Sequence, residues 1–68
     1  MRFFQTKGKS AKYVLSIYGP HIEDHIYYHY YNDAKMRFNS LAEERHEKET
    51  IISIYDLDKD IRKDFIRF

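Results

Sequence analysis

One stretch of the chain, residues 32–49, has apolar residues at the spacing of an amphipathic helix. They recur at i, i+4, i+7 and i+8, with polar residues on the opposite side, and they are Ala34, Phe38, Leu41 and Ala42. Asn32 or Asp33 can cap the first turn. Two i,i+4 pairs of opposite charge also favour a helix: Asp33 with Arg37, and Glu44 with Lys48. We therefore predict one helix over residues 33–48, with an apolar stripe that packs on a sheet.

Four other stretches are rich in the β-branched and aromatic residues that strands prefer. These predicted strands cover residues 13–18, 25–31, 50–55 and 61–68. Gly19-Pro20 and the acidic stretch 56–60 separate them as turns, and the last stretch could form a short helix instead. The order ββαββ predicts a single small α+β domain over residues 1–68, a four-stranded, mostly antiparallel sheet with one helix packed on one face. Residues 1–12 add either a short edge strand or a flexible tail.

Strand periodicity assigns side chains to the two faces of the sheet, because successive residues of a strand point to opposite sides. Residues 14–18 (VLSIY) and 51–55 (IISIY) repeat one pattern, so both strands should present alike to the helix. The residues expected to face the helix are Leu15, Ile17, Ile52 and Ile54. In the second strand Ile26, Tyr28 and Tyr30 share one face. The fourth strand changes its pattern halfway, which a β-bulge or burial on two sides would explain.

The opposite side of the predicted sheet is the candidate site, because one helix covers only one face. It would carry a patch of apolar and aromatic residues: Val14, Tyr18, Tyr27, Tyr31, Ile51 and Tyr55. Contiguous patches of this kind mark interfaces, and tyrosine is a favoured interface residue. The alternatives are that Phe3-Phe4 or Phe68 folds over the patch, or that the tyrosines keep their hydroxyls in water on a solvated sheet.

Length and composition narrow the classes of function. A chain of 68 residues buries a small core and is marginally stable alone, which favours association. It has no cysteine, so no disulfide can add stability, and that suits a reducing compartment. No apolar run reaches membrane-spanning length, and the N-terminus lacks the apolar segment of a signal peptide. We therefore expect a cytoplasmic protein with no membrane partner.

Three histidines form the sharpest candidate for a metal site. His21, His25 and His29 lie at i, i+4 and i+8, so on a helix they would form a ridge of metal ligands. That requires residues 20–48 to form one long helix, which is the alternative to the strand at 25–31. On a strand, His25 and His29 would be roughly 13 Å apart, too far for one ion. We expect exposed histidines, with no metal and no cofactor.

Histidine, serine and acidic residues, which often act in catalysis, are present here as they are in most chains. No glycine-rich phosphate loop, nucleophile elbow or paired-acid motif occurs, and the chain has two glycines. So short a chain leaves little material for a pocket of the usual ~300 Å³ or more. The sequence therefore predicts that the protein is not an enzyme.

Nucleic-acid binding is the alternative use of the aromatic surface. Tyrosines on a sheet beside Arg62, Lys63, Arg67 and the basic N-terminus are similar to platforms that stack single-stranded bases. Against this, the net charge is only +1, and acids at positions 56, 58, 60 and 64 interleave with the cations. We expect a non-catalytic module that binds another protein, or a second copy of itself as a homodimer, through the patch.

The tyrosine-rich strand that enters the helix and the strand IISIYDL that leaves it resemble small ββαββ accessory proteins encoded by bacterial phages and prophages. The resemblance covers most of the chain. It implies an accessory protein that binds and modifies a host factor, and it carries over no functional residues.

Overall fold

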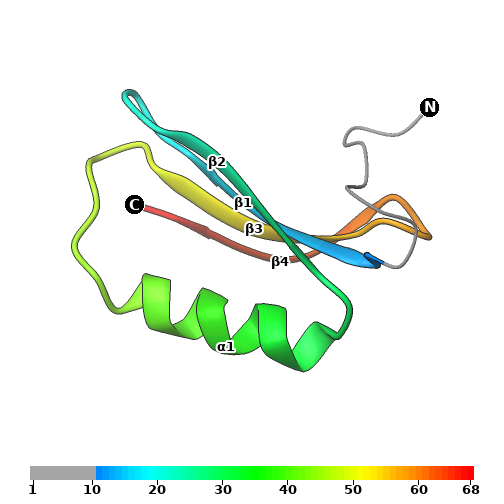
Figure 1. Ribbon diagram of the computed structural model, residues 1–68. Coiled ribbons are helices and arrows are strands. Elements are labelled where there is room, and N and C mark those ends of the chain that lie inside the picture. Colours follow the sequence, from blue (N-terminus) through cyan, green and yellow to red (C-terminus); the bar gives the residue numbers. More distant parts are fainter. Residues whose placement is uncertain (1–10) are drawn as a thin grey trace.

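Four strands and one helix make up the fold in the computed structural model, which describes residues 11–68. In chain order the elements are β1 (Tyr13–Tyr18), β2 (Glu23–Tyr28), α1 (Tyr31–Ala42), β3 (Ile51–Asp56) and β4 (Ile61–Arg67). The strands form one antiparallel sheet in the order β2-β1-β3-β4, and α1 lies along one face of it (Figure 1). The predicted ββαββ fold is confirmed. The expectation for residues 1–12 falls mostly outside the described part of the chain.

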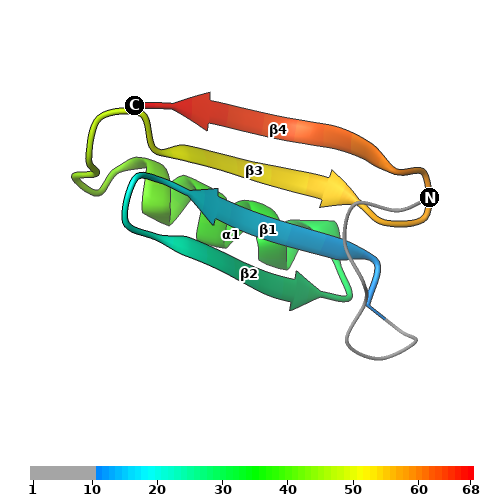
Figure 2. The ribbon, with the colours of Figure 1, turned by 90° about the horizontal axis from the view of Figure 1, so that it is seen from above.

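The sheet consists of two hairpins side by side, β1–β2 and β3–β4, and α1 carries the chain from the edge strand β2 back to the inner strand β3 (Figure 2). In the β1–β2 turn the Gly19 amide donates to the carbonyl of Ile22 at 2.8 Å. A Cβ atom at Gly19 would lie 2.8 Å from Oγ1 of the buried Thr50, so only glycine fits this close approach. The turn of the first hairpin is thereby packed against the chain that enters β3.

The helix begins and ends earlier than the sequence predicts. It covers Tyr31–Ala42, so the prediction of residues 33–48 is wrong at both ends. Tyr30 is the N-cap residue and makes no side-chain capping bond, so the expected cap by Asn32 or Asp33 is wrong as well. Because α1 already begins at Tyr31, Asn32 and Asp33 lie inside its first turn and cannot be its N-cap.

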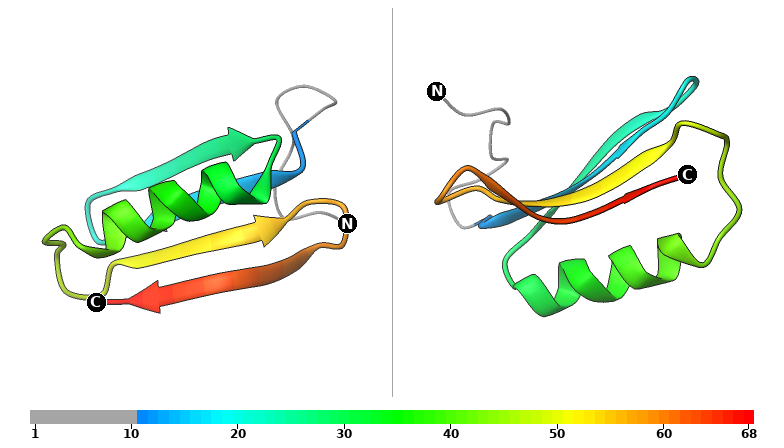
Figure 3. Two further views of the ribbon diagram at one scale, coloured as in Figure 1. Left: turned by 90° about the horizontal axis from the view of Figure 1, so that it is seen from below. Right: turned by 180° about the vertical axis from the view of Figure 1, so that it is seen from behind.

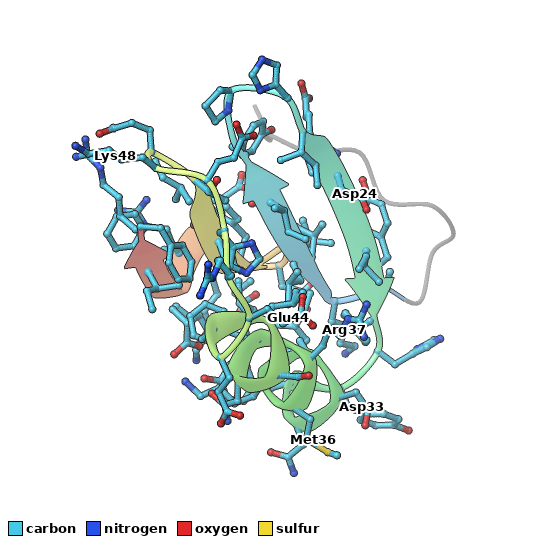
Figure 4. The ribbon with its side chains drawn as sticks, turned by 90° about the vertical axis from the view of Figure 1, so that its left-hand side faces the viewer. Asp24, Asp33, Met36, Arg37, Glu44 and Lys48 are labelled. Carbon is cyan, nitrogen blue, oxygen red and sulfur yellow. The ribbon has the colours of Figure 1, made fainter. Side chains whose placement is uncertain are left out.

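The chain leaves the helix layer after Ala42 in order to reach the start of β3. His46 Nε2 donates to the carbonyl of Leu41 at 2.6 Å, and its ring packs against Phe68 with the ring centres 4.6 Å apart. Glu49 then adopts a positive φ of 74° just before β3. Glu44 and Lys48 lie beyond the helix and apart from each other (Figure 4), so their predicted helical pair does not form.

The core lies between α1 and the sheet (Figure 3). Its buried apolar side chains come from β1, β3 and α1, and they are Leu15, Ile17, Ala34, Phe38, Leu41, Ile52 and Ile54. These include all four strand residues that the periodicity assigned to the helix side, so that prediction is confirmed. Met36 points away from the sheet and is 71 % exposed (Figure 4). The apolar stripe of the helix therefore faces the sheet in the predicted orientation.

The last segment, β4, is a strand with a bulge and does not form the short helix that the sequence left open as an alternative. In the register with β3, one extra residue, Lys63, lies between the pairs Ile54–Asp64 and Tyr55–Arg62. Asp64 pairs with Ile54 and so faces the helix, whereas Arg62, beyond the bulge, pairs with Tyr55. The β4 side chains on the opposite side are Arg62, Phe65 and Arg67. The bulge therefore decides which charges of β4 reach the candidate site.

Candidate functional site

The side of the sheet away from α1, called the outer face below, is a grid of three rows across four strands. Antiparallel partners point to the same side, so the strand register defines each row. In the order β2, β1, β3, β4 the rows are Glu23, Tyr18, Ile51 and Arg67; His25, Ser16, Ser53 and Phe65; and Tyr27, Val14, Tyr55 and Arg62. Tyr18, Tyr27, Tyr55 and Ile51 thus lie together on the outer face, as the periodicity predicted.

The two serines at the centre of the outer face are buried. Ser16 is 1 % exposed and Ser53 is 2 % exposed, and Ser16 Oγ has no hydrogen-bond partner among the described residues. Beside them the Tyr18 hydroxyl lies 3.0 Å from His25 Nε2, and the two rings meet edge to face. Tyr18 therefore leans along the sheet rather than standing upright. The side chains within reach of a partner are the rings, and not the serines below them.

Exposure of the rings differs across the outer face. Phe65 is 47 % exposed and Tyr18 is 37 % exposed, whereas Tyr27 and Tyr55 are half-buried. Burial raises the pKa of Tyr18 above 10.0, and the neighbouring Glu23, Tyr55 and Tyr27 raise it further. The phenol groups therefore lie close enough to sense one another's charge, as expected for one continuous aromatic patch.

Val14 is part of a second, smaller core and not of the exposed patch. It is fully buried and packs with Leu57, which is 1 % exposed. Tyr27 and Tyr55 pack over this pair. The prediction that Val14 contacts a partner is therefore wrong, because its methyl groups are already covered. Leu57 was not expected here, since it lies in the acidic stretch 56–60; a single apolar residue inside that polar turn was the only available signal.

Tyr31 lies on the helix side, so its predicted position on the outer face is wrong. β2 ends at Tyr28 and the chain turns before α1, which breaks the alternation that placed Tyr31. Its ring meets that of Tyr13 edge to face, with the centres 5.7 Å apart. Its hydroxyl donates to the Asp64 carboxylate, which also accepts from Lys35 Nζ at 2.8 Å. Tyr31 thereby joins α1 to β4 instead of meeting a partner.

The bond between Tyr31 and Asp64 changes how both groups titrate. This hydrogen bond is the main reason that the pKa of Tyr31 rises to about 12, and burial of the phenol contributes to the same rise. Burial acts to raise the pKa of Asp64, but the hydrogen bonds from Lys35 and Tyr31 outweigh it, so that pKa lies below 3.8. Asp64 is therefore ionised and paired at neutral pH, and its charge is directed away from the outer face.

The charges of the outer face lie at its corners. Glu23 is exposed on β2, and Arg62 and Arg67 are exposed on β4. The Arg62 guanidinium lies over the Phe65 ring, 4.1 Å from its centre, and Arg67 forms an exposed ion pair with Glu49. The acid that interleaves with these cations in the sequence, Asp64, faces the helix. The two edges of the face are therefore opposite in charge.

The histidines are spread over different elements. β2 is a strand, so the alternative of one long helix over residues 20–48 is ruled out. His21 lies in the β1–β2 turn, 3.2 Å from a Glu47 oxygen; His25 lies beside Tyr18; and His29 lies in the turn before α1. Within residues 11–68 no group of three or more His, Cys, Asp or Glu side chains could hold a metal ion.

One open hollow lies where β2 passes into α1. It has a volume of about 500 Å³ and is lined by Lys12, Tyr13, His29, Tyr30 and Tyr31. The expectation that so short a chain leaves little material for a pocket of that size is therefore wrong. The sequence reasoning missed this hollow because its residues come from two separate stretches, a strand start and a turn. Its lining holds tyrosine rings, a lysine and a histidine, but no carboxylate.

Comparison with known proteins adds no relative: no family model, no curated protein and no solved structure matches the chain. The resemblance to phage accessory proteins therefore stays a prediction. In the part of the chain that the structure describes, no helix is long and apolar enough to cross a membrane.

Proposed function

We propose that the protein is a non-catalytic binding module that uses the outer face of the sheet to bind another protein. The observation that carries this proposal is the exposure of Phe65 and Tyr18 on the side of the sheet opposite α1. Tyrosine, phenylalanine and arginine are enriched in protein interfaces, and exposed patches of such residues mark binding sites. The outer face combines these residue types on one side of the sheet.

The packing of the rings also supports this use. An aromatic side chain left in water does not gain the free energy that its burial would give. Neither Phe65 nor Tyr18 is part of the core on the helix side, so this free energy is available on binding. The two rings are nevertheless held in place, Phe65 by the Arg62 guanidinium and Tyr18 by His25. A surface whose rings are already ordered loses less entropy when it binds. The partner we propose, on the resemblance to phage accessory proteins, is a bacterial host protein.

Capture from a bacterial lysate tests this function. The wild-type chain is compared with Tyr18→Ser/Phe65→Ser on the outer face, and the matched control is Tyr30→Ser/Met36→Ser, since both control residues are 71 % exposed and lie elsewhere. The lysate is treated with nuclease, so that captured proteins are not held through nucleic acid. We expect the control to retain the proteins that the wild type captures and the outer-face variant to lose them. Equal capture by the outer-face variant would contradict the proposal.

Single-stranded nucleic acid is a second candidate, favoured by one observation. The bulge at Lys63 sorts the charges of β4 by face, so Arg62 and Arg67 flank Phe65 on the outer face while Asp64 turns to the helix. Rings beside cations are the pattern of base-stacking surfaces. A salt titration separates the two classes, because nucleic-acid affinity falls steeply with salt whereas contacts between aromatic protein surfaces change little. Binding of a labelled oligonucleotide that is lost on raising the salt would support this second candidate.

A further inference from the structure

We infer that one protein partner of the outer face is the outer face of a second copy of the chain, in a dimer whose two-fold axis runs parallel to the strands. The inference rests on the proposed function, since it requires that the outer face binds protein. It is carried by the four corners of the grid: Glu23 and Tyr27 on β2, and Arg67 and Arg62 on β4. All but Tyr27 are exposed, and their arrangement decides which dimers avoid contacts between like charges.

Two sheets that pack face to face align their strands within about 30° or cross them near 90°. A two-fold dimer uses the same surface on both copies, so each corner meets one fixed corner of the partner. Four orientations of the axis are therefore open to the outer face: parallel to the strands, perpendicular to them, or along either diagonal. Each orientation can be checked against the charges at the corners.

With the axis parallel to the strands, β2 of one copy lies over β4 of the other, and each row of the grid lies over the same row of the second copy. Glu23 then meets Arg67 of the second copy, and the symmetry repeats this pair at the opposite corner. Tyr27 meets Arg62, so a ring faces a cation at the remaining two corners. In the middle of the first row, Tyr18 meets Ile51. This orientation pairs opposite charges at two corners and places no two like-charged corners of the grid together.

The other three orientations bring like charges together. An axis perpendicular to the strands places Arg67 over Arg62 of the second copy, twice. One diagonal axis places Arg67 over itself, and the other places Glu23 over itself. Like charges placed together at an interface suppress that mode of binding. The charge pattern therefore selects the axis parallel to the strands.

The existing partner of Arg67 does not prevent the new pair. Arg67 donates to Glu49 in an ion pair whose two side chains are 58 % and 56 % exposed. A guanidinium has five N–H donors, so it can bind a second carboxylate from the other copy. Partial burial in the dimer would strengthen both contacts, because less water competes for the same donors.

The size of the outer face limits the strength of the dimer. Four strands about 4.8 Å apart, and six residues that each rise about 3.4 Å, give a footprint of roughly 400 Å². Stable interfaces bury about 800 Å² on each partner. We therefore expect a weak dimer, with a dissociation constant of about 10–100 μM at low salt.

Sedimentation equilibrium of the full chain at several concentrations tests the orientation by charge reversal. Each substitution acts twice in a symmetric dimer, so Glu23→Arg or Arg67→Glu alone should weaken association by about tenfold or more. The double variant Glu23→Arg/Arg67→Glu re-forms both pairs with reversed signs, and should return to within about threefold of the wild type. Asp24→Arg is the matched control, because Asp24 pairs with Ile17 and faces the helix side, and it should change little. Unfolding curves verify that each variant folds, and Glu23→Gln offers a milder change that leaves the Arg67–Glu49 pair in place.

Failure of this inference can be told apart from failure of the proposed function. If the double variant is as weak as the single variants, the selected axis is wrong. If Tyr18→Ser/Phe65→Ser abolishes self-association while charge reversal changes nothing, the face is right but the orientation is overturned. If the wild-type chain stays monomeric up to about 500 μM, fivefold above the largest dissociation constant expected, the inference that a second copy covers the outer face is wrong. In that last case, capture of a lysate protein by the outer face would still support the proposed function.

Discussion

The two inner strands of the sheet, β1 and β3, contribute side chains to both of its faces, but the two faces are covered in different ways. On the helix side, Leu15, Ile17, Ile52 and Ile54 meet the apolar stripe of α1. On the outer face, the residues between them are Ser16 and Ser53, which lie directly opposite each other in the β1–β3 register. They are buried as deeply as the aliphatic residues, yet the rings around them are half-buried or exposed. Deep burial therefore occurs on both faces, and what distinguishes the outer face is the exposure of its outermost layer of rings.

Truncating the core on the helix side of the sheet should lower the stability of the fold most. Phe38 is 7 % exposed and Leu41 is 6 % exposed, so truncating either to alanine leaves a cavity between α1 and the sheet. Phe38→Ala should lower the free energy of unfolding by about 3–5 kcal/mol and Leu41→Ala by about 2–5 kcal/mol. A loss of this size is a large fraction of the stability of a domain this small. Urea denaturation followed by circular dichroism measures it, with Met36→Ala as the exposed control. A greater loss for Met36→Ala would mean that the helix is rotated from the described orientation.

A smaller effect is expected from the second core under the outer face. Leu57 is buried against Val14, but only half-buried tyrosine rings cover the pair. Leu57→Ala should cost about 2 kcal/mol, the low end for a buried leucine, because Tyr27 and Tyr55 can settle into the space. The same denaturation experiment measures it. A loss as large as that of Phe38→Ala would show that the outer face is a second rigid core, and would weaken the contrast between the faces.

The smallest of the three effects depends on pH. Asp64 has a lowered pKa in the folded chain, so its contribution is fully present above 3.8 and is lost as the pH falls through the lower folded value. Tyr31 has the opposite sign: its pKa rises from 10.0 to about 12, so its contribution is present below 10.0 and is lost as the pH rises through about 12. Asp64→Asn should cost about 1–2 kcal/mol at neutral pH. Thermal melts from acid to neutral pH should show a shallower loss of stability on acidification for this variant; an unchanged acid slope would rule out the role given to Asp64.

Strand alternation could be read from the sequence wherever a strand kept its period. The faces of β1 and β3 followed from it, as did the buried stripe of Ala34, Phe38 and Leu41 from the helical period. Alternation failed at Tyr31 because the chain turns after Tyr28, and turn geometry is not visible in a run of tyrosines. The end of the helix was misplaced because no glycine marks it and because the His46 side chain binds the carbonyl of Leu41 near that end. Leu57 and the hollow at Tyr30 depend on contacts between distant segments, which periodicity does not report.

The faces that the charged side chains of β4 occupy could not be predicted from the sequence either. In the sequence Asp64 stands among Arg62, Lys63 and Arg67 and looks as if it neutralises them. The bulge adds one residue, and this reverses the face of every side chain on one side of it. The inserted residue thus separates Asp64 from Arg62, with which it would otherwise share a face, whereas Arg67 faces away from Asp64 by alternation alone. The irregular pattern of β4 suggested a bulge, but not its position.

Chemical-shift mapping can show whether the outer face is the surface that a partner protein covers, as we propose. Spectra of the isotope-labelled chain are recorded at rising concentration of unlabelled chain, and with any host protein that it captures. We expect the shift changes to gather on Tyr18, Ile51 and Phe65, while Tyr30 and Met36 on other surfaces stay unchanged. Shifts confined to α1 or to the hollow at Tyr30, with the outer face unmoved, would contradict it.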